Sequence, residues 1–243
     1  MILSRLHPVE EAVRSRPREI EWVLFDSGRR DRRTGELKRA CRSLGIATRY
    51  GEKKALDRLA GPRHQGVVAR LAIRGYLGGE AAFEGKAGER FLLLLDQIQD
   101  PQNLGAILRV AEGAGAAVVL PERGSAPLSE AVARSSAGAV ERVPVIRVGN
   151  LRRFLDRLKS QGFRAVGLDP AGTEIYRLDL TGDLALVVGS EGKGLRRLVR
   201  EGCDLLARLP MKGELASLNA AAAAAAAAYE VVRQRGFSPK VLD

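Results

Sequence analysis

The stretch FLLLLDQIQDPQNLGAILR runs from Phe91 to Arg109 and joins a continuous apolar run to a helical pattern. A strand without polar alternation is typical of a parallel sheet covered on both faces. Asp100 is suited to cap the following helix, with Pro101 at its first position. Leu104, Ile107, Leu108 and Ala111 then form one buried stripe. The stretch predicts a strand followed by a helix, the repeating unit of an α/β fold.

The same alternation recurs to the end of the chain. We expect strands near residues 91–95, 117–120, 143–146, 165–168, 184–188 and 205–209, with helices between several of them. The pattern alone predicts an open, doubly wound and mainly parallel sheet, because connection rules favour simple crossovers. Ligands of such sheets bind at the carboxyl ends of the strands.

Upstream of this region the sequence predicts a second, smaller unit. Helical patterns at 8–16 and 36–44, a strand at 21–25 and a basic loop at 29–33 indicate a small α/β domain. Five glycines within residues 75–89 predict a flexible linker. We therefore expect an amino-terminal domain at 1–74, a glycine-rich linker at 75–89 and a larger domain at 90–243.

The charge composition indicates a polyanionic partner. Lys and Arg number 40 against 29 Asp and Glu, which leaves a net charge of +11. Residues 1–88 carry 19 of the cations and 11 of the anions, so the excess lies mainly in the first third. Arginine, which supplies 32 of the 40 cations, pairs well with phosphate.

Other classes are disfavoured by composition. Cys41 and Cys203 lie far apart and only two histidines are present, so neither a disulfide framework nor a zinc cluster is expected. We expect no metal and a reducing, cytoplasmic setting. No strongly apolar run of 18 residues occurs, and we expect no membrane association.

Three loops at predicted strand ends hold the candidate site. The first contains Asn103, Gly105 and Arg109; a glycine one turn before Arg109 leaves bare backbone for the guanidinium or for a ligand. A tolerated glycine beside a solvated arginine is the alternative. The second loop, Gly189-Ser-Glu-Gly-Lys-Gly194, matches neither a P-loop nor a dinucleotide fingerprint, and a plain turn is its alternative.

The third loop runs from Leu209 to Asn219 and precedes nine alanines at 220–228. Ser217 or Asn219 could simply cap the alanine helix. A helix with so little side-chain bulk is suited to packing closely against another backbone, although low complexity alone also produces such a run.

Taken together, the three loops resemble the motifs of the SpoU (TrmH) family of RNA ribose 2′-O-methyltransferases, in the SPOUT superfamily. The matching segments are Asn103-x-Gly-x-x-x-Arg109, Gly189-x-Glu-Gly-x-Gly194, and Pro210-Met-x-Gly213 through Ser217-Leu-Asn219. His7–Val13 and Arg63–Ala69 resemble the start and end of an amino-terminal RNA-recognition domain found in some members. The likeness is greatest to the enzymes that methylate a guanosine ribose in 23S ribosomal RNA.

The resemblance implies a carboxyl-terminal trefoil knot, S-adenosylmethionine as cofactor and a homodimer. It implies that Gly189, Leu209 and Leu218 contact the cofactor. Arg109 would be the catalytic residue, with Asn103, Glu191, Ser217 and Asn219 around it.

We hypothesise that Arg109 holds the phosphate beside the target ribose and stabilises the developing alkoxide, since arginine stays protonated in proteins. Glu191 would orient Arg109. RNA would contact the basic cluster Arg29, Arg30, Arg32 and Arg33 and also His64. A solvated loop and a structural histidine are the alternatives.

Two other functions stay open for this chain. The RNA target could be a transfer RNA ribose, or the protein could be a non-catalytic RNA-binding factor in ribosome assembly. A nicotinamide-dependent oxidoreductase is disfavoured because no glycine fingerprint follows the first strand of the larger domain.

Overall fold

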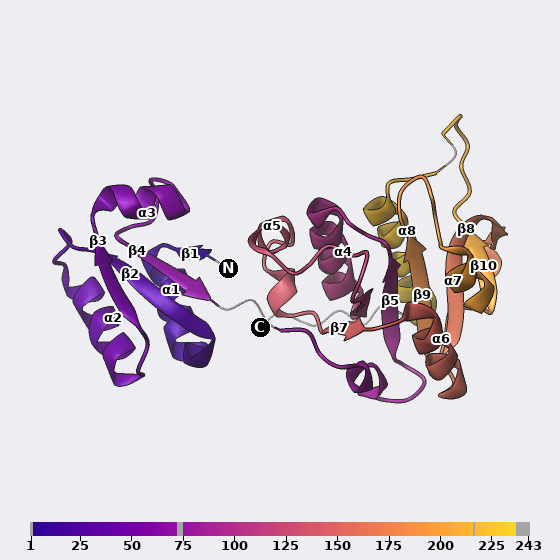
Figure 1. Ribbon diagram of the computed structural model, residues 1–243, viewed down its shortest axis with the longest axis horizontal. Helices are drawn as coiled ribbons and strands as arrows, with labels where there is room; N and C mark the ends of the chain where they lie inside the picture. The colour runs from indigo at the N-terminus through magenta and orange to yellow at the C-terminus, as the bar shows by residue number, and fades with distance from the viewer. Residues whose placement is uncertain (1, 72–74, 216, 237–243) are drawn as a thin grey trace. The chain divides into compact units, whose positions relative to one another are not determined.

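The computed structural model describes residues 2–71, 75–215 and 217–236. It divides the chain into two compact units, residues 1–74 and residues 75–243 (Figure 1). Each unit has its own sheet and its own core. In the described ranges, no helix is long and apolar enough to cross a membrane.

The first unit is a four-stranded sheet in the order β1-β4-β2-β3, with helices on both faces. Its strands are β1 (Ile2–Ser4), β2 (Ile20–Asp26), β3 (Thr48–Gly51) and β4 (Val67–Leu71), and its helices are α1 (Leu6–Ser15), α2 (Arg32–Ser43) and α3 (Lys53–Ala60), with the 3-10 turn η1 (Pro17–Glu19). Only β2 and β3 pair in parallel; β4 is antiparallel to β1 and β2. The predicted small α/β unit is therefore present, with a mixed sheet.

The expected basic loop at 29–33 is shorter in the structure, because α2 begins at Arg32. Asp31 caps this helix: its carboxylate accepts hydrogen bonds from the Thr34 amide at 3.0 Å and the Thr34 hydroxyl at 2.9 Å. A side-chain hydrogen bond from Arg29 and those from Thr34 hold the pKa of Asp31 well below its usual range. Arg32 and Arg33 thus lie on the first helical turn.

The second unit is built on a six-stranded sheet in the order β10-β8-β9-β5-β6-β7, in which every neighbouring pair is parallel. Its strands are β5 (Phe91–Asp96), β6 (Ala117–Pro121), β7 (Val145–Val148), β8 (Arg164–Glu174), β9 (Leu184–Gly189) and β10 (Leu205–Arg208). The predicted parallel sheet is confirmed, and β7 begins two residues later than expected. The knot stays a prediction, since strand order does not specify how the chain threads.

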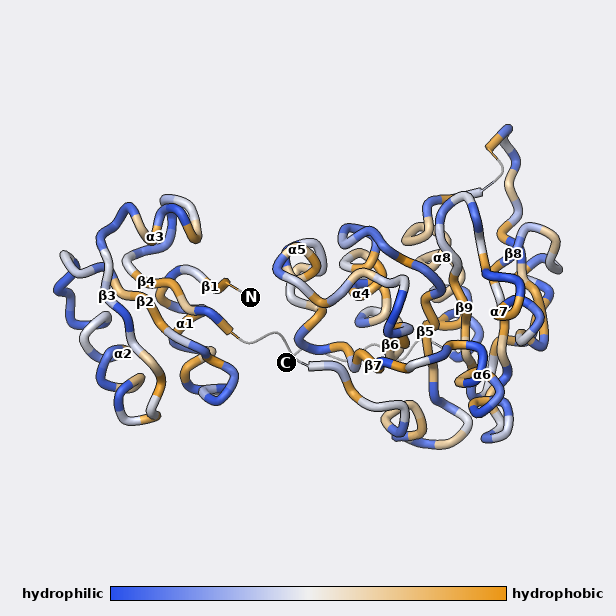
Figure 2. Tube along the Cα trace, viewed as in Figure 1, coloured by the Kyte–Doolittle hydropathy of each residue, from blue (hydrophilic) through white to orange (hydrophobic). Residues whose placement is uncertain are grey.

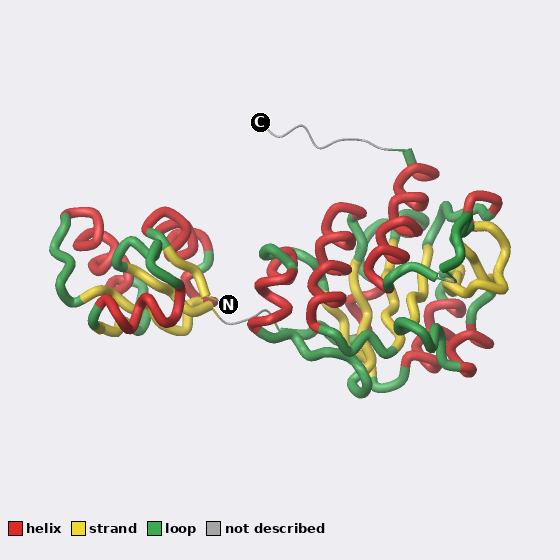
Figure 3. The backbone as a smooth tube through the Cα atoms, turned by 90° about the horizontal axis from the view of Figure 1, so that it is seen from above, coloured by secondary structure: helices red, strands yellow, loops and turns green. Residues whose placement is uncertain are grey.

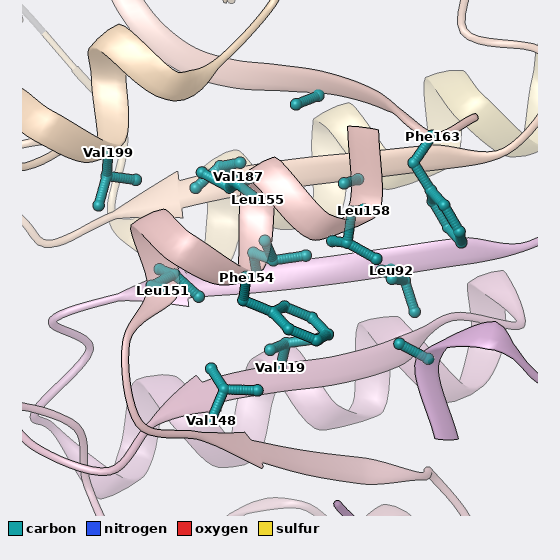
Figure 4. Packing of buried hydrophobic residues seen from close by; sticks show 14 of the residues in the cluster. Leu92, Val119, Val148, Leu151, Phe154, Leu155, Leu158, Phe163, Val187 and Val199 are labelled. Atoms are coloured by element: carbon teal, nitrogen blue, oxygen red, sulfur yellow. The ribbon is translucent and has the colours of Figure 1, made fainter. Parts of the chain in front are cut away.

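Helices cover both faces of this sheet (Figure 3). One face carries α4 (Pro101–Ala114), α5 (Glu130–Ser135) and α8 (Ala220–Arg235), and the other carries α6 (Leu151–Ser160) and α7 (Arg197–Gly202); short 3-10 turns are η3 (Ala139–Glu141) and η4 (Ile175–Arg177). Phe154, Leu155 and Leu158 of α6 pack against Leu92 and Val187 of the central strands (Figure 4). Figure 2 shows these strands as hydrophobic along their length, as expected for a sheet buried on both sides.

The segment 75–89, expected as a linker, is packed onto the second unit. Leu77 forms a parallel bridge with Ile146, donating its amide to the Val145 carbonyl at 2.8 Å. The 3-10 turn η2 (Gly79–Phe83) buries Ala82 and places Phe83 on the core. The glycines here shape turns, and the three apolar residues 81–83 between them supply the packing that a flexible linker lacks.

A partly buried ion pair joins the residue before β5 to the residue before β9. Arg90 and Asp183 are 13% and 8% exposed, and Arg90 Nη2 donates to Asp183 Oδ2 at 2.6 Å. Burial by itself would raise the pKa of Asp183, but hydrogen bonds from the Arg90 side chain and from the Gly88 and Arg90 amides outweigh it and lower that pKa to about 2.

We expect Asp183→Asn to reduce the free energy of unfolding by about 2 kcal/mol at pH 7. A carboxylate whose folded pKa is depressed stabilises the protein above its unfolded pKa and loses this effect as pH falls through the folded value. The difference between wild type and variant should therefore shrink between about pH 5 and pH 2 in urea unfolding. Glu80→Gln, at an exposed ion pair with Arg157, is the control and should change stability by less than about 0.5 kcal/mol; a pH-independent loss would contradict the assignment.

Candidate active site

Three segments far apart in sequence meet at the carboxyl edge of the large sheet. Asn103 Nδ2, on α4, donates to Glu191 Oε1 at 2.8 Å across 88 residues of chain. Asn219 Nδ2, before α8, donates to Asn103 Oδ1 at 3.0 Å across 116 residues, and also to Glu191 Oε1. We call Asn103, Glu191 and Asn219 the polar cluster. The structure therefore joins one residue from each of the three sequence loops.

The Asn219 side chain caps α8 through its oxygen and hydrogen-bonds to the polar cluster through its nitrogen. Its Oδ1 accepts from the amides of Ala221 at 2.9 Å and Ala222 at 3.3 Å, so it is the N-cap of α8. Its Nδ2 is left to point into the cluster. The capping alternative is thus correct for Asn219, and the cap also determines which side of the amide faces the site.

A tight turn after β9 carries Glu191 into the cluster. Ser190 and Gly194 exchange two backbone hydrogen bonds, of 3.2 and 2.9 Å. A methyl group on Gly189 would lie 2.2 Å from the Gly194 carbonyl carbon, so the backbone itself occupies the space a side chain would need. Glycine at position 189 is therefore required for the turn to close.

A cavity of about 510 Å³ opens at the carboxyl ends of β9 and β10, the middle of β8 and the start of α8. Gly189, Leu209 and Leu218, the predicted cofactor contacts, all line it. Ser217 lines it too, with its side chain exposed and not hydrogen-bonded to the polar cluster in the described chain. A cavity of this size, lined by apolar residues such as Val188, Leu209 and Leu218 and by polar groups of the glycine turn, fits a nucleoside-sized cofactor.

A smaller cavity, of about 300 Å³, adjoins the first. Asn103 lines it together with the loop 97–100 after β5. Both cavities share Ser190, Glu191, Lys193 and Ala220. The polar cluster therefore lies at the boundary between a cofactor-sized space and a second opening large enough for a sugar.

Sequence reasoning missed Asp96, the last residue of β5. This carboxylate is fully buried and pairs in register with Gly189 on β9. It accepts hydrogen bonds from the Arg196 amide at 2.8 Å and Arg196 Nε at 2.7 Å, which ties the β5 end to the residue capping α7. An acidic residue directly after a buried apolar run was the signal available in the sequence.

Arg109 does not join the polar cluster within this chain. It is exposed on α4 and forms no hydrogen bond or ion pair with any residue in the described ranges. It is six positions after Asn103, which in an α-helix is about 9 Å of rise and a rotation of about 120° around the helix axis. The expected contact from Glu191 to Arg109 is therefore absent within the subunit, where Glu191 is bonded by the two amides instead.

Gly105 serves helix packing, contrary to our expectation that it accommodates Arg109 or a ligand. A methyl group there would lie 1.9 Å from Ser135 Oγ and 2.9 Å from the Ser135 carbonyl carbon on α5. Ser135 Oγ donates to the Pro101 carbonyl at 3.0 Å. The glycine lets α5 approach α4 closely, and this contact could not be derived from the local sequence.

The basic cluster of the first unit is largely paired with carboxylates. Arg29 contacts Asp31 at 2.5 Å, Arg32 contacts Glu36 at 2.9 Å, and Arg33 makes a two-pronged contact with Glu10 at 2.6 and 2.8 Å. Arg30 is exposed and has no ion pair in the portion of the chain described. Of the four arginines, Arg30 is the one whose charge is uncompensated.

The burial of His64 favours the structural alternative over the expected contact with RNA. Its side chain is 3% exposed. Nδ1 accepts from the Gly66 amide at 2.9 Å, so the proton lies on Nε2, 3.2 Å from Asp57 Oδ1. Both ring nitrogens are therefore used in holding the segment before β4.

The fold and the site define a class: an α/β enzyme with a nucleoside-type cavity at the carboxyl edge of a parallel sheet and a polar cluster beside it. In the described residues no group of three or more His, Cys, Asp or Glu side chains could hold a metal ion. Residues 90–229 match the model of the SpoU rRNA methylase family, and residues 6–77 match that of the RNA 2′-O ribose methyltransferase substrate-binding domain. The chain belongs to the SpoU rRNA methylase family.

Similar proteins cover nearly the whole chain. A 23S rRNA (guanosine-2′-O-)-methyltransferase of Ralstonia nicotianae is 41% identical over 98% of this chain and 97% of its own length. One from Pseudomonas aeruginosa is 40% identical over 95% of each. The crystal structure of the SpoU methyltransferase AviRb from Streptomyces viridochromogenes with AdoMet matches 97% of this chain and 90% of its own, with a TM-score of 0.76 and 27% identity.

Proposed function

We propose that this protein transfers a methyl group from S-adenosylmethionine to the ribose 2′-hydroxyl of a guanosine in 23S ribosomal RNA. The observation that carries the proposal is the polar cluster at the boundary of the two cavities. The named activity of the Ralstonia and Pseudomonas relatives supports the choice of ribose, base and RNA.

The 510 Å³ cavity fits S-adenosylmethionine, with Gly189, Leu209 and Leu218 as its contacts. When bound, this cofactor supplies a methyl group activated by a sulfonium. Glu191 accepts a hydrogen bond from each of the two amides and thereby orients them. Asn103 and Asn219 thereby hold fixed positions beside the second opening, where a ribose hydroxyl has to be aligned for in-line attack.

Arg109 from a second copy of the chain would stabilise the developing alkoxide and hold the neighbouring phosphate, and that phosphate or a water molecule would take the proton of the 2′-hydroxyl. Its exposure and its distance from the polar cluster of its own subunit support an active site shared across a homodimer. The helices α4 and α8 pack side by side, and each has an exposed face. The exposed residues include Gln102, Arg109 and Gly113 on α4, and Ala222, Ala226, Tyr229 and Arg233 on α8. Ala222 and Ala226 are the small side chains of the α8 face, and a partner helix could approach α8 closely at these positions.

The direct test is incubation of the purified protein with labelled S-adenosylmethionine and unmodified 23S rRNA or transfer RNA, followed by mapping of the labelled nucleotide. Methylation of a guanosine ribose in 23S rRNA is the expected result. Label confined to transfer RNA would move the substrate to that class. RNA binding without transfer would favour a non-catalytic assembly factor.

With ribosomal RNA as substrate and two unpaired cysteines, we place the activity in the cytoplasm.

We expect Arg30→Gln to flatten the salt dependence of RNA binding more than Arg33→Gln does. Arg30 is uncompensated, whereas Glu10 already neutralises Arg33. Loss of one phosphate contact lowers the slope of log K against log salt by roughly 0.7 for single-stranded RNA. The difference is checked by measuring RNA affinity over a range of about 50 to 200 mM salt. Equal slopes for wild type and Arg30→Gln would place the phosphate contacts elsewhere.

A further inference from the structure

Tyr50 presents an aromatic ring at the edge of the first unit's sheet. It lies on β3, the edge strand, opposite Phe25 of β2, and the residue as a whole is 50% exposed. The two ring centroids are 6.1 Å apart, and Lys38 Nζ of α2 lies 5.2 Å from the Tyr50 centroid and 5.3 Å from that of Phe25. Phe25 and Lys38 contact the ring, while Tyr50 as a whole remains 50% exposed.

Three cations lie on the segments that follow the ends of β2 and β3. The parallel strands β2 and β3 end together, and the Ser27 amide and hydroxyl both bond the Gly51 carbonyl, at 2.9 and 3.2 Å. The loop that carries Arg30 follows β2, and the start of α3, with Lys53 and Lys54, follows β3. Both segments therefore leave the sheet at the same end of these two strands. All three cations are exposed and form no ion pair with the residues that the structure describes. Exposed Glu52 is the acidic side chain between Tyr50 and the lysines.

We propose that Tyr50 is a stacking platform for an unpaired base of the substrate RNA, with Arg30, Lys53 and Lys54 contacting phosphates on either side of that nucleotide. The inference rests on the proposed function, and it specifies the substrate as RNA with a single-stranded segment at this edge. An open aromatic ring between cations binds unpaired nucleotides by stacking and charge together. A duplex hides its base faces, so the ring would contribute nothing to duplex binding.

The test compares full-length wild type, Tyr50→Ala, Tyr50→Phe and Tyr176→Ala. Tyr176 is a tyrosine of the second unit, 57% exposed and outside both cavities, and it serves as the matched control. Affinity is measured for a 12-nucleotide oligouridine and for a duplex RNA of the same length. We expect Tyr50→Ala to weaken oligouridine binding about tenfold, Tyr50→Phe to bind as wild type, and duplex binding to change in neither variant.

Methyl transfer to unmodified 23S rRNA gives a second readout. Tyr50→Ala should raise KM for the RNA and leave kcat and the affinity for S-adenosylmethionine unchanged. A general folding defect would instead lower kcat and the affinity for S-adenosylmethionine, and it would reduce the Tm. Oligouridine affinity of Tyr50→Ala equal to that of wild type, or equal loss for duplex and oligouridine, would overturn the stacking role. A wild-type protein that binds RNA through Tyr50 but transfers no methyl group would instead refute the proposed activity.

Discussion

Arg109→Lys is expected to lower the rate of methyl transfer by roughly 100- to 1000-fold while S-adenosylmethionine binds with unchanged affinity. Lysine keeps the positive charge but loses the planar fork that contacts a phosphate and an alkoxide together. Arg109 lines neither cavity, so cofactor binding does not depend on it. Single-turnover rates and calorimetric titration with the cofactor measure the two effects. Parallel loss of cofactor binding would contradict this division of roles.

Mixing two inactive variants tests whether Arg109 acts across a dimer. Glu191→Ala should also be inactive, because it removes the shared acceptor of both amides. In a heterodimer of the two variants, the Arg109→Lys subunit keeps a wild-type polar cluster and the Glu191→Ala subunit keeps a wild-type Arg109. If the arginine acts across the dimer, these two parts meet in one complete site, and the other site lacks both. Random re-association of the two variants should therefore recover about one quarter of wild-type activity for a twofold symmetric pair. Absence of any recovery, with heterodimers demonstrated by mass, would place Arg109 in the site of its own chain.

Gly189→Ala is expected to abolish S-adenosylmethionine binding and to lower the free energy of unfolding by about 2 kcal/mol. The added methyl group would overlap the Gly194 carbonyl carbon at 2.2 Å and its oxygen at 2.4 Å. These are backbone atoms held by the two Ser190–Gly194 hydrogen bonds, so the turn has to open. The same movement would withdraw Glu191 from the polar cluster.

Gly75→Ala is the matched control, because an added methyl group there meets nothing within 4 Å and no left-handed backbone is required. It should bind the cofactor as wild type does. Urea unfolding and calorimetric titration distinguish the two glycines. Normal cofactor affinity in Gly189→Ala would show that the turn tolerates a side chain and would remove the close-approach explanation for this glycine.

Local patterns predicted much of the larger unit. The apolar run at 91–95 and the capping pair Asp100 and Pro101 correspond to β5 and the start of α4, with all four members of the expected stripe buried. Such features depend on neighbours a few residues away, so the sequence shows them directly. The beginning of α2 was misplaced because Asp31, a cap with its own local signal, was read as part of a basic loop.

Residues whose role depends on a distant partner were harder to assign. His64 was read as an RNA contact, yet its neighbours Asp57 and Gly66 and its burial favour a structural role. Gly105 was linked to Arg109, four positions away, although Ser135 is the side chain that requires it. In each case sequence proximity was a poor guide to spatial contact.

From its order of residue types alone, this chain specifies alternating strands and helices, a parallel sheet, a basic first unit and three motifs that belong to one family. Those properties follow from backbone periodicity, capping and composition, which act over short distances along the chain. Folding in three dimensions decided that Glu191 accepts hydrogen bonds from two amides 88 and 28 residues away, that Asp96 is buried in register with Gly189, and that Arg109 makes no hydrogen bond to the polar cluster of its own chain within the described residues. Hydrogen bonds and steric exclusion between remote segments exist only once the sheet has brought the strand ends together.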